Sequence, residues 1–402
     1  MKIGITFNFN NKKIFSNGLG QNTIFLYDMF KNIEGVKSVQ LIDVYKRDFK
    51  EYQEIGWLNG YDVINWDLKD LNDIDLIIVL GSFPSDKSMS DFKKLSNNKK
   101  IVYYVGGNNL AIDQERMIFE KTWASKDKDV PSSNFVTSKN IDEIWMVPQQ
   151  EYHNLDYLSI VFNCPTRVVP FIWSPKFIKQ NAELIETNSD YTPYFDNKID
   201  SIDTWKIGSI EPNINVVKTA YPILFALEEF YNKTNNKDKV SFNIMNSKEL
   251  MDNPTLISIC KSLNIHKDGK LTFDVRYPIA FISSRILDLI VSHQWENPLN
   301  YAYLDAVYFG IPLVHNARLC KDIGYYYEDY KLKTAANLIE HAIQNRKTDI
   351  NYTSRNREII ERYQFDKNSN ILTQYRQLID MLQGDFINST YNWESNSISF
   401  AK

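Results

Sequence analysis

The chain is predicted to be an α/β protein built from two doubly wound, Rossmann-like domains. Along its 402 residues, short apolar runs alternate with longer segments of helical period, a pattern typical of parallel strands joined by crossover helices. The alternation stops near residue 174 and resumes after residue 203, and the length suits two or three domains. We therefore expect domains over residues 1–175 and 200–365, with residues 366–402 forming a helix and tail that return to the first.

Six apolar runs in the first half have the length of buried strands. The run from Leu76 to Leu80 is apolar throughout, as expected for a strand that is covered on both faces. The predicted strands cover residues 2–9, 38–44, 75–81, 100–105, 143–147 and 166–171.

Residues 174–203 are predicted to form a linker, because Pro175, Pro193 and the polar run 188–190 interrupt the periodicity. The alternation then predicts a second set of elements. The strands cover residues 206–210, 240–245, 271–275, 288–292 and 311–315, and the helices cover 216–231, 248–263, a segment from 298, and a helical region from 335 that ends with 368–382.

Composition and charge exclude several classes of protein. The chain has 46 Lys and Arg residues against 50 Asp and Glu residues, so a net charge of −4 excludes a polycation, and 43% hydrophobic residues exclude a mainly disordered chain. Three widely spaced cysteines without a C-x-x-C pair predict neither disulfides nor a zinc site, and favour a reducing compartment. We see no signal-peptide pattern and no apolar stretch of about 18 residues, and expect a cytoplasmic protein.

Residues 292–316 are the most informative segment, with the pattern strand, loop, helix, turn, strand. Asn297 is a suitable N-cap, Pro298 suits the first helical position, and Gly310 is expected to end the helix in a left-handed turn. Free main-chain amides at such a helix start bind anions, so a diphosphate is predicted to lie near residues 297–300.

Two side chains of this segment are candidates for contact with a nucleotide. Asp305 lies off the apolar stripe of the predicted helix and could accept hydrogen bonds from ribose hydroxyls; the alternative is a solvated carboxylate on a structural helix. Trp295 is the aromatic residue favoured to stack on a sugar or base, whereas Trp145, Trp173 and the tyrosines of 325–327 are by default core residues.

This arrangement resembles the donor-site segment of GT-B glycosyltransferases, which commonly carry two acidic residues eight positions apart around such a helix. Here Glu296 and Asp305 are nine positions apart, and Asp replaces the usual second Glu. Four blocks resemble a poorly characterised family of glycosyltransferase-like proteins from bacteria and their phages: residues 17–22, 211–219, 292–297 and 322–327. The resemblance covers most of the chain and implies the GT-B fold, with two Rossmann-like domains facing a cleft and a C-terminal helix that crosses back.

The resemblance implies a hexosyl- or pentosyltransferase with a nucleoside diphosphate sugar as donor, UDP being the favoured nucleotide, and the donor site in the second domain. Lys218 would neutralise the diphosphate as the leaving group gains charge, although a lysine near a helix start is by default at the surface. Glu211 would bind sugar hydroxyls or pair with Lys218, and His293 would contact the sugar or phosphate. The implied catalytic residues are Glu296, Lys218 and His293, and the implied donor-binding residues are Glu211, Asn213, Lys218, Trp295, Asn297, Asn300 and Asp305.

Two glycine-containing loops of the first domain are candidates for acceptor or phosphate binding. Residues 17–22 lie between the first strand and a predicted helix over 23–30, and lack the third glycine of a dinucleotide fingerprint. Gly106 and Gly107 follow another strand and leave room for a sugar ring. An ordinary turn is the alternative that the residues alone favour in both places. The candidates are Gly18, Leu19, Gly20, Gln21, Asn22, Gly107 and Asn108.

No permanent cofactor and no divalent metal are expected. His293 and His315 follow adjacent predicted strands, but neither an H-x-x-x-H nor an Asp-x-Asp spacing accompanies them.

The acceptor remains open between a bacterial surface glycan and a hydroxymethylated pyrimidine in phage DNA, in a bacterial or phage-infected cell. The net charge argues mildly against DNA, whereas a cluster of Lys93, Lys94, Lys99 and Lys100 on the cleft face would favour it. Inversion and retention at the anomeric carbon are equally open. Two alternative functions are a noncatalytic nucleotide-sugar-binding protein and a sugar-nucleotide epimerase of the same fold.

Overall fold

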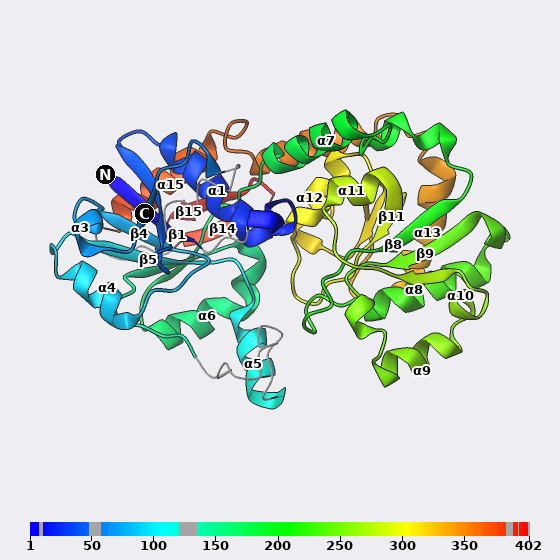
Figure 1. Ribbon diagram of the computed structural model, residues 1–402, viewed down its shortest axis with the longest axis horizontal. Helices are drawn as coiled ribbons and strands as arrows, with labels where there is room; N and C mark the ends of the chain where they lie inside the picture. The colour runs from blue at the N-terminus through cyan, green and yellow to red at the C-terminus, as the bar shows by residue number, and fades with distance from the viewer. Residues whose placement is uncertain (8–10, 48–57, 120–134, 383–388, 393, 401–402) are drawn as a thin grey trace. The chain divides into compact units, whose positions relative to one another are not determined.

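The computed structural model describes residues 1–7, 11–47, 58–119, 135–382, 389–392 and 394–400. The chain divides into two compact units. The first comprises Met1–Ser174 and Arg362–Lys402, and the second comprises Pro175–Glu361. Each contains a parallel sheet with helices on its faces (Figure 1).

The sheet of the first unit has seven strands in the order β3-β2-β1-β4-β5-β6-β7, all paired in parallel. The strands are β1 (Lys2–Phe7), β2 (Ser38–Asp43), β3 (Val63–Asn65), β4 (Leu76–Val79), β5 (Lys100–Val105), β6 (Glu143–Met146) and β7 (Thr166–Val168). All six strands predicted from the sequence are present, and the last two positions of the predicted strand 2–9 lie outside the described residues. The edge strand β3 was missed because only two apolar residues, Val63 and Ile64, stand between Asp62 and Asn65.

Helices cover both faces of this sheet, because successive strand residues point to opposite sides. On one face, Ile77 and Ile101 pack against Met89 of α4 (Asp86–Lys93) and Leu158 of α6 (Glu151–Phe162). Figure 1 shows these two helices below the sheet. The apolar run in β4 is thus buried from both sides, as predicted.

The other face is covered by α1 (Gly18–Lys31) and α15 (Asn370–Met381) (Figure 1). Tyr375 of α15 packs edge-on against Phe30 of α1 and against Trp145 of β6. Its hydroxyl donates to the carbonyl of Pro170 at 2.9 Å. The C-terminal region therefore supplies part of the core of the first unit.

The remaining helices and strands of the first unit lie at its edges and along its connections. They are η1 (Asn11–Ser16), α3 (Leu68–Leu71), α5 (Asn109–Phe119), η3 (Pro148–Gln150), η10 (Glu361–Tyr363, which spans the boundary) and the antiparallel hairpin of β14 (Ser389–Asn392) and β15 (Ser397–Phe400).

The sheet of the second unit has six parallel strands in the order β10-β9-β8-β11-β12-β13. They are β8 (Trp205–Ser209), β9 (Val240–Ile244), β10 (Leu271–Phe273), β11 (Leu289–Val291), β12 (Leu313–His315) and β13 (Tyr325–Tyr326). The five predicted strands are present, and the two-residue β13 was missed.

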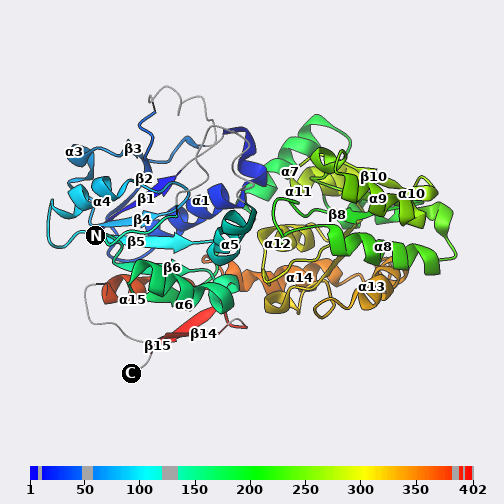
Figure 2. The same ribbon diagram turned by 90° about the horizontal axis from the view of Figure 1, so that it is seen from below.

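Helices α8 (Tyr221–Lys233) and α13 (Leu332–Asn345) pack side by side in this unit (Figure 2). The other helical elements are α7 (Lys176–Asn188), α9 (Pro254–Ser262), α10 (Asn264–Lys267), α11 (Ile279–Phe281), α12 (Tyr301–Tyr308), α14 (Tyr352–Ile360), η4 (Phe195–Asn197), η5 (Ile199–Ser201), η6 (Lys237–Lys239), η7 (Lys248–Leu250), η8 (Ile282–Ile286) and η9 (Arg318–Cys320).

Three predictions about this unit are wrong. The linker expected over 174–203 contains the 13-residue helix α7, because Phe177, Ile178 and Ala182 form a buried stripe at helical spacing. The helix expected from residue 216 begins at Tyr221. The helix expected over 248–263 is divided into η7 and α9, because the side chain of Asn253 caps α9.

Both sheets have the strand order of a dinucleotide-binding fold, the first with one additional strand. The order reverses between β1 and β4 in the first sheet and between β8 and β11 in the second. Ligands of open parallel sheets bind at the carboxyl ends of the strands beside such a reversal. The loops that follow β8 and β11 are therefore the first place to look for a site in the second unit.

Candidate functional site

A buried carboxylate lies at the carboxyl end of β8. Glu211 is 0% exposed, and it accepts hydrogen bonds from the Ser292 hydroxyl and, at 2.8 Å, from Gln294 Nε2. The hydroxyl of Tyr303 lies 2.5 Å from Ser292 Oγ and acts as the donor, because the Ser292 proton is directed to Glu211. Burial raises the pKa of Glu211 to about 7. Side chains from β8 and β11 thus meet at the reversal of strand order.

Lys218 lies in the same loop and interacts electrostatically with Glu211. Its main chain closes a tight turn, since Asn213 N–H donates to Lys218 O at 3.0 Å and Lys218 N–H donates to Asn215 Oδ1 at 3.2 Å. The Lys218 side chain is half-buried. Burial lowers its pKa, and the Glu211 carboxylate opposes this shift. A partly desolvated ammonium group of this kind attracts anions strongly.

Arg276 is a second cation beside Lys218, and its charge contributes to the lowered pKa of Lys218. It follows β10, and its side chain is exposed. The sequence analysis missed it because no recognisable motif surrounds it. Two cations from different loops lie near each other at this edge of the sheet.

Gln294 connects Glu211 to the start of α12. While Nε2 donates to Glu211, Oε1 accepts hydrogen bonds from the side-chain amides of Asn297 and, at 3.3 Å, Asn300. Asn300 is the N-cap of α12, and its Oδ1 accepts from Ala302 N–H at 3.1 Å. Ser292 and Gln294 were not singled out from the sequence, since neither type predicts a buried network.

The predicted start of this helix is wrong. Asn297 does not cap it, because its amide is hydrogen-bonded to Gln294 and because a residue before Pro298 favours an extended backbone. Asn297 is only 3% exposed and Leu299 only 1%. The main-chain anion site predicted at residues 297–300 thus does not coincide with the observed start of α12 at Tyr301.

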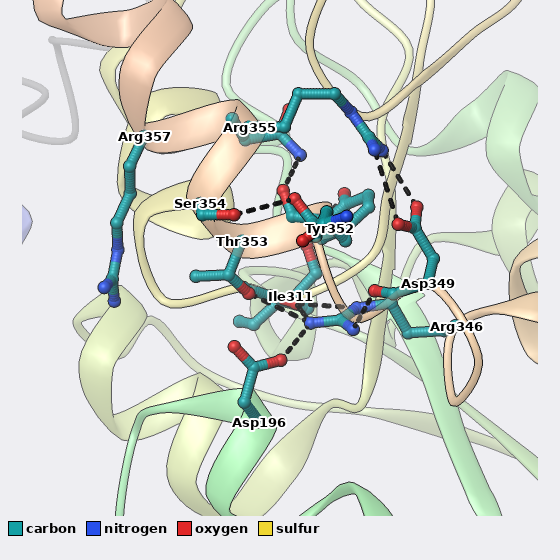
Figure 3. Close-up of polar contacts among 12 residues, drawn as sticks. Asp196, Ile311, Arg346, Asp349, Tyr352, Thr353, Ser354, Arg355 and Arg357 are labelled. Carbon is teal, nitrogen blue, oxygen red and sulfur yellow. Dashed lines mark hydrogen bonds and ion pairs between the residues drawn. The ribbon is translucent and has the colours of Figure 1, made fainter.

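The other end of α12 behaves as predicted. Gly310 has φ +78°, directly after the C-cap Phe309. Buried Arg346 donates to Gly310 O at 3.1 Å and to Thr353 Oγ1 at 3.0 Å, and it pairs with Asp196 (Figure 3). This cluster fixes the connection from α12 to β12.

The loop after β11 contains three of the predicted site residues: His293, Trp295 and Glu296. His293 is buried, and burial lowers its pKa to about 4, so it is neutral at pH 7. Its Nδ1 lies 2.9 Å from the hydroxyl of Tyr327.

Trp295 is 39% exposed, unlike Trp145 and Trp173, which are core residues. The main-chain N–H of Trp295 donates to Val217 O at 2.9 Å, which joins this loop to the loop of Lys218.

Left-handed backbone conformations gather at the same edge of the sheet. Asn213, Asn246, Glu296 and Asp329 have φ between +48° and +56° and follow β8, β9, β11 and β13. Asn and Asp adopt this conformation more readily than other residues with a side chain, so it is costly chiefly at Glu296. A strained residue of this kind is typical of functional sites.

Two predicted donor-binding side chains have surroundings that the sequence did not indicate. Asn213 is engaged within the protein, since it donates to Met245 O at 3.2 Å and accepts from Ala220 N–H at 2.7 Å. This bond lies directly before α8, which begins at Tyr221. Asp305 is 6% exposed, so the alternative of a solvated carboxylate is wrong.

The first candidate loop of the first unit is largely helical. Gly18, Leu19, Gly20, Gln21 and Asn22 form the start of α1, which Asn17 caps, so the predicted loop over 17–22 is wrong. Gln21 and Asn22 are buried, whereas Leu19 is 45% exposed. The Asn17 cap signal was present in the sequence but was outweighed by the two glycines.

The second candidate loop is open at Gly107. A Cβ atom added there would meet nothing within 4 Å. Asn108 is buried, and its Oδ1 accepts from Ala111 N–H and from Asn154 Nδ2, both at 3.1 Å. Asn108 thus has a structural role as a cap of α5.

The four lysines considered for DNA contact lie away from the ligand edge. Lys99 and Lys100 are at the amino end of β5, where Lys99 Nζ donates to main-chain carbonyls. Lys93 pairs with Asp142 at 2.6 Å, and Lys94 pairs with Asp91 at 3.0 Å. The arrangement that would favour DNA is not present.

His315 uses both ring nitrogens within the protein, because Nε2 donates to Ile323 O at 2.9 Å and Nδ1 accepts from Ala317 N–H at 3.1 Å. Across the described ranges, no three His, Cys, Asp or Glu side chains are grouped in a way that could hold a metal ion. In the same part of the chain, none of the helices is both long and apolar enough to span a bilayer.

Comparison with solved structures shows which class of fold this is. An E. coli trehalose-6-phosphate structure with bound UDP-2-fluoro glucose matches with a TM-score of 0.54 at 12% identity, covering 96% of this chain and 100% of the other. The α,α-trehalose 6-phosphate synthase from Burkholderia multivorans matches with a TM-score of 0.52 at 11% identity, covering 95% and 98%. Together with the two parallel sheets, these matches establish the GT-B fold that the sequence predicted.

The chain belongs to the DUF2827 family, described as proteins of unknown function, whose family pattern matches residues 3–379. No curated protein matches it.

Proposed function

We propose that this protein is a glycosyltransferase that takes its sugar from a nucleoside diphosphate sugar, with UDP as the favoured nucleotide, and transfers it to a hydroxyl acceptor. The observation that carries the proposal is the half-buried Lys218 beside the buried carboxylate of Glu211, at the point where the second sheet reverses its strand order. A similar fold binds UDP-2-fluoro glucose in the E. coli structure.

Lys218 binds the diphosphate in this proposal. Transfer of the sugar leaves negative charge on the nucleoside diphosphate, and a fixed ammonium group stabilises that charge more in the transition state than in the ground state. Arg276 supports Lys218, since its charge is near enough to be felt there. The Glu211 carboxylate opposes the lowering of the Lys218 pKa by burial and so favours the charged ammonium group.

The loop after β11 supplies the remaining donor contacts. We assign Glu296 to the transferred sugar and Trp295 to stacking, because Trp295 is 39% exposed within a loop otherwise rich in buried side chains. Asp305 remains the proposed ribose ligand. Asn297, Asn300 and Asn213 act indirectly, through the hydrogen bonds that shape the two loops.

We assign the acceptor to the first unit, at the open position of Gly107. A neutral glycan suits this region better than DNA, because the lysines that could have met a phosphate backbone lie at the amino end of β5 or are paired with carboxylates.

The experiment is a donor panel. UDP, GDP and dTDP and their glucose derivatives are titrated into the protein by calorimetry, and nucleotide release is followed over hours with and without glycan and hydroxymethylated-DNA acceptors. The proposal predicts binding of a nucleoside diphosphate and slow release from the sugar nucleotide. Binding without release in any arm would favour a noncatalytic nucleotide-sugar-binding protein, and absence of all binding would refute the proposal.

A further inference from the structure

The imidazole of His293 has one ring nitrogen that is satisfied and one that is not. Nδ1 contacts the hydroxyl of Tyr327 at 2.9 Å. Nε2 is buried and has no hydrogen-bond partner among the residues that the structure describes. A buried polar atom without a partner is unfavourable and requires an explanation, such as a ligand that is bound during function.

The position of the single Tyr327 proton decides the tautomer of His293. The Tyr327 hydroxyl donates to the carbonyl of Ser292 at 3.0 Å, and a carbonyl oxygen can only accept. Both contacts of Tyr327 are hydrogen bonds only if its oxygen accepts from His293 Nδ1–H. A neutral imidazole carries one N–H, so Nε2 holds a lone pair and no proton.

An unprotonated nitrogen selects its partner chemically. It accepts a hydrogen bond from a hydroxyl or N–H group, but it has nothing to donate to a phosphate oxygen. Burial also disfavours the charged form of the imidazole, so His293 is a weak base and is poorly suited to proton transfer. The remaining role is that of a hydrogen-bond acceptor.

His293 lies close beneath the surface at the carboxyl edge of the sheet. Tyr330 packs on its ring with centroids 4.4 Å apart, and Tyr330 is itself 57% exposed. Asp329, which precedes Tyr330, has φ +48°. Tyr330 is thus an exposed side chain whose displacement would uncover the ring of His293.

We propose that His293 accepts a hydrogen bond through Nε2 from a hydroxyl of the bound nucleotide sugar, and thereby favours donors that carry a hydroxyl at that position. This inference rests on the proposed function. The hydroxyl belongs either to the transferred sugar or to the ribose, which share the same chemistry.

The first test needs no ligand. The protein is labelled with ¹⁵N-histidine, and the His293 signals are identified by their absence in His293→Gln. At pH 7 the inference predicts a neutral ring protonated at Nδ1. A ring protonated at Nε2, or at both nitrogens, would overturn it.

The second test measures the affinities for UDP and UDP-glucose. His293→Phe keeps a ring against Tyr330 but removes the acceptor, and should weaken UDP-glucose binding by about 10- to 100-fold. His293→Gln, which restores an acceptor, should recover most of that loss. His266→Phe, an exposed position on α10, is the matched control and should leave both affinities unchanged.

The two arms identify the hydroxyl. An effect on UDP-glucose alone assigns it to the transferred sugar, and an equal effect on UDP assigns it to the ribose. If the wild type binds both ligands and His293→Phe binds them equally well, the inference fails and the proposed function stands. If the wild type binds neither ligand, the proposed function fails, whatever tautomer the spectra show.

Discussion

The two sheets reverse their strand order in the same way, yet the residues at the two reversals differ. In the first unit, Thr6 at the end of β1 donates to Ser82 O at 2.8 Å, and Ser82 Oγ donates to Phe7 O at 2.9 Å. In the second unit, the loop after β8 holds the carboxyl group of Glu211 and the ammonium group of Lys218, and the loop after β11 adds Ser292 and Gln294. Among the described residues, the neutral hydroxyls at the first reversal are satisfied by main-chain carbonyls, whereas the second reversal carries charged side chains. The strand order provides the place, and the side chains decide the chemistry.

The largest effect is expected when the positive charge of Lys218 is removed from the point where the second sheet reverses its strand order. Lys218→Ala should lower kcat/KM for sugar transfer by about 100- to 1,000-fold, since a group that stabilises developing negative charge is lost. Steady-state kinetics with the donor found in the panel measure this. The control is Lys206→Ala, an exposed lysine on the same strand β8 but at its amino end. Equal activity of both variants would remove Lys218 from the mechanism.

The buried carboxylate should make the stability of the second unit depend on pH. The pKa of Glu211 is raised from 4.5 to about 7, so its neutral form is favoured on folding. The resulting stability is fully present below about pH 4.5 and is lost as pH rises through 7, in total about 3 kcal/mol.

Glu211→Gln should remove this dependence. The free energy of unfolding of the variant relative to wild type should rise by about 3 kcal/mol between pH 4.5 and pH 8, measured by urea titration at each pH. The difference also cancels the contributions of His293 and His315, which are common to both proteins. Glu229→Gln, on the partly exposed Glu229 that pairs with Lys233, should show no such trend. Parallel pH profiles for wild type and Glu211→Gln would show that the carboxylate is not desolvated.

The connection between α12 and β12 is stabilised by the buried side chain of Arg346. Arg346→Ala should destabilise the second unit by about 2 to 4 kcal/mol, because the carbonyl of Gly310 and the hydroxyl of Thr353 lose a donor. The exposed Arg355, which pairs with Asp349 at 2.8 Å, is the matched control (Figure 3). Arg355→Ala should cost about 0.5 kcal/mol or less in the same chemical denaturation experiment.

The smallest effect is expected in the first unit. Asn108→Ala removes the cap of α5 and should cost about 1 kcal/mol of stability, with the affinity for UDP unchanged within about twofold. Gly107→Ala, at a position with free space, should leave stability unchanged. A loss of UDP affinity in either variant would contradict the assignment of the nucleotide to the second unit.

The pattern of apolar residues in the sequence predicted nearly every strand, because a buried strand needs a run of apolar residues whatever elements pack against it. It missed β3, which has only two adjacent apolar residues, and the two-residue β13. Helix boundaries were less predictable. The sequence predicted Asn297 as the cap of α12, but the side chain of Asn297 is hydrogen-bonded to Gln294 and Asn300 caps the helix.

By itself the sequence determined the α/β class, the parallel sheets and the chain segments that meet at the carboxyl edge, because these follow from local patterns of apolar and turn-forming residues. The tertiary structure alone decided the network of Glu211, Ser292, Gln294 and Tyr303, the tautomer of His293 and the proximity of Arg276 to Lys218. These features join residues up to 83 positions apart in the chain, and burial and hydrogen bonding at such separations are properties of the packed fold.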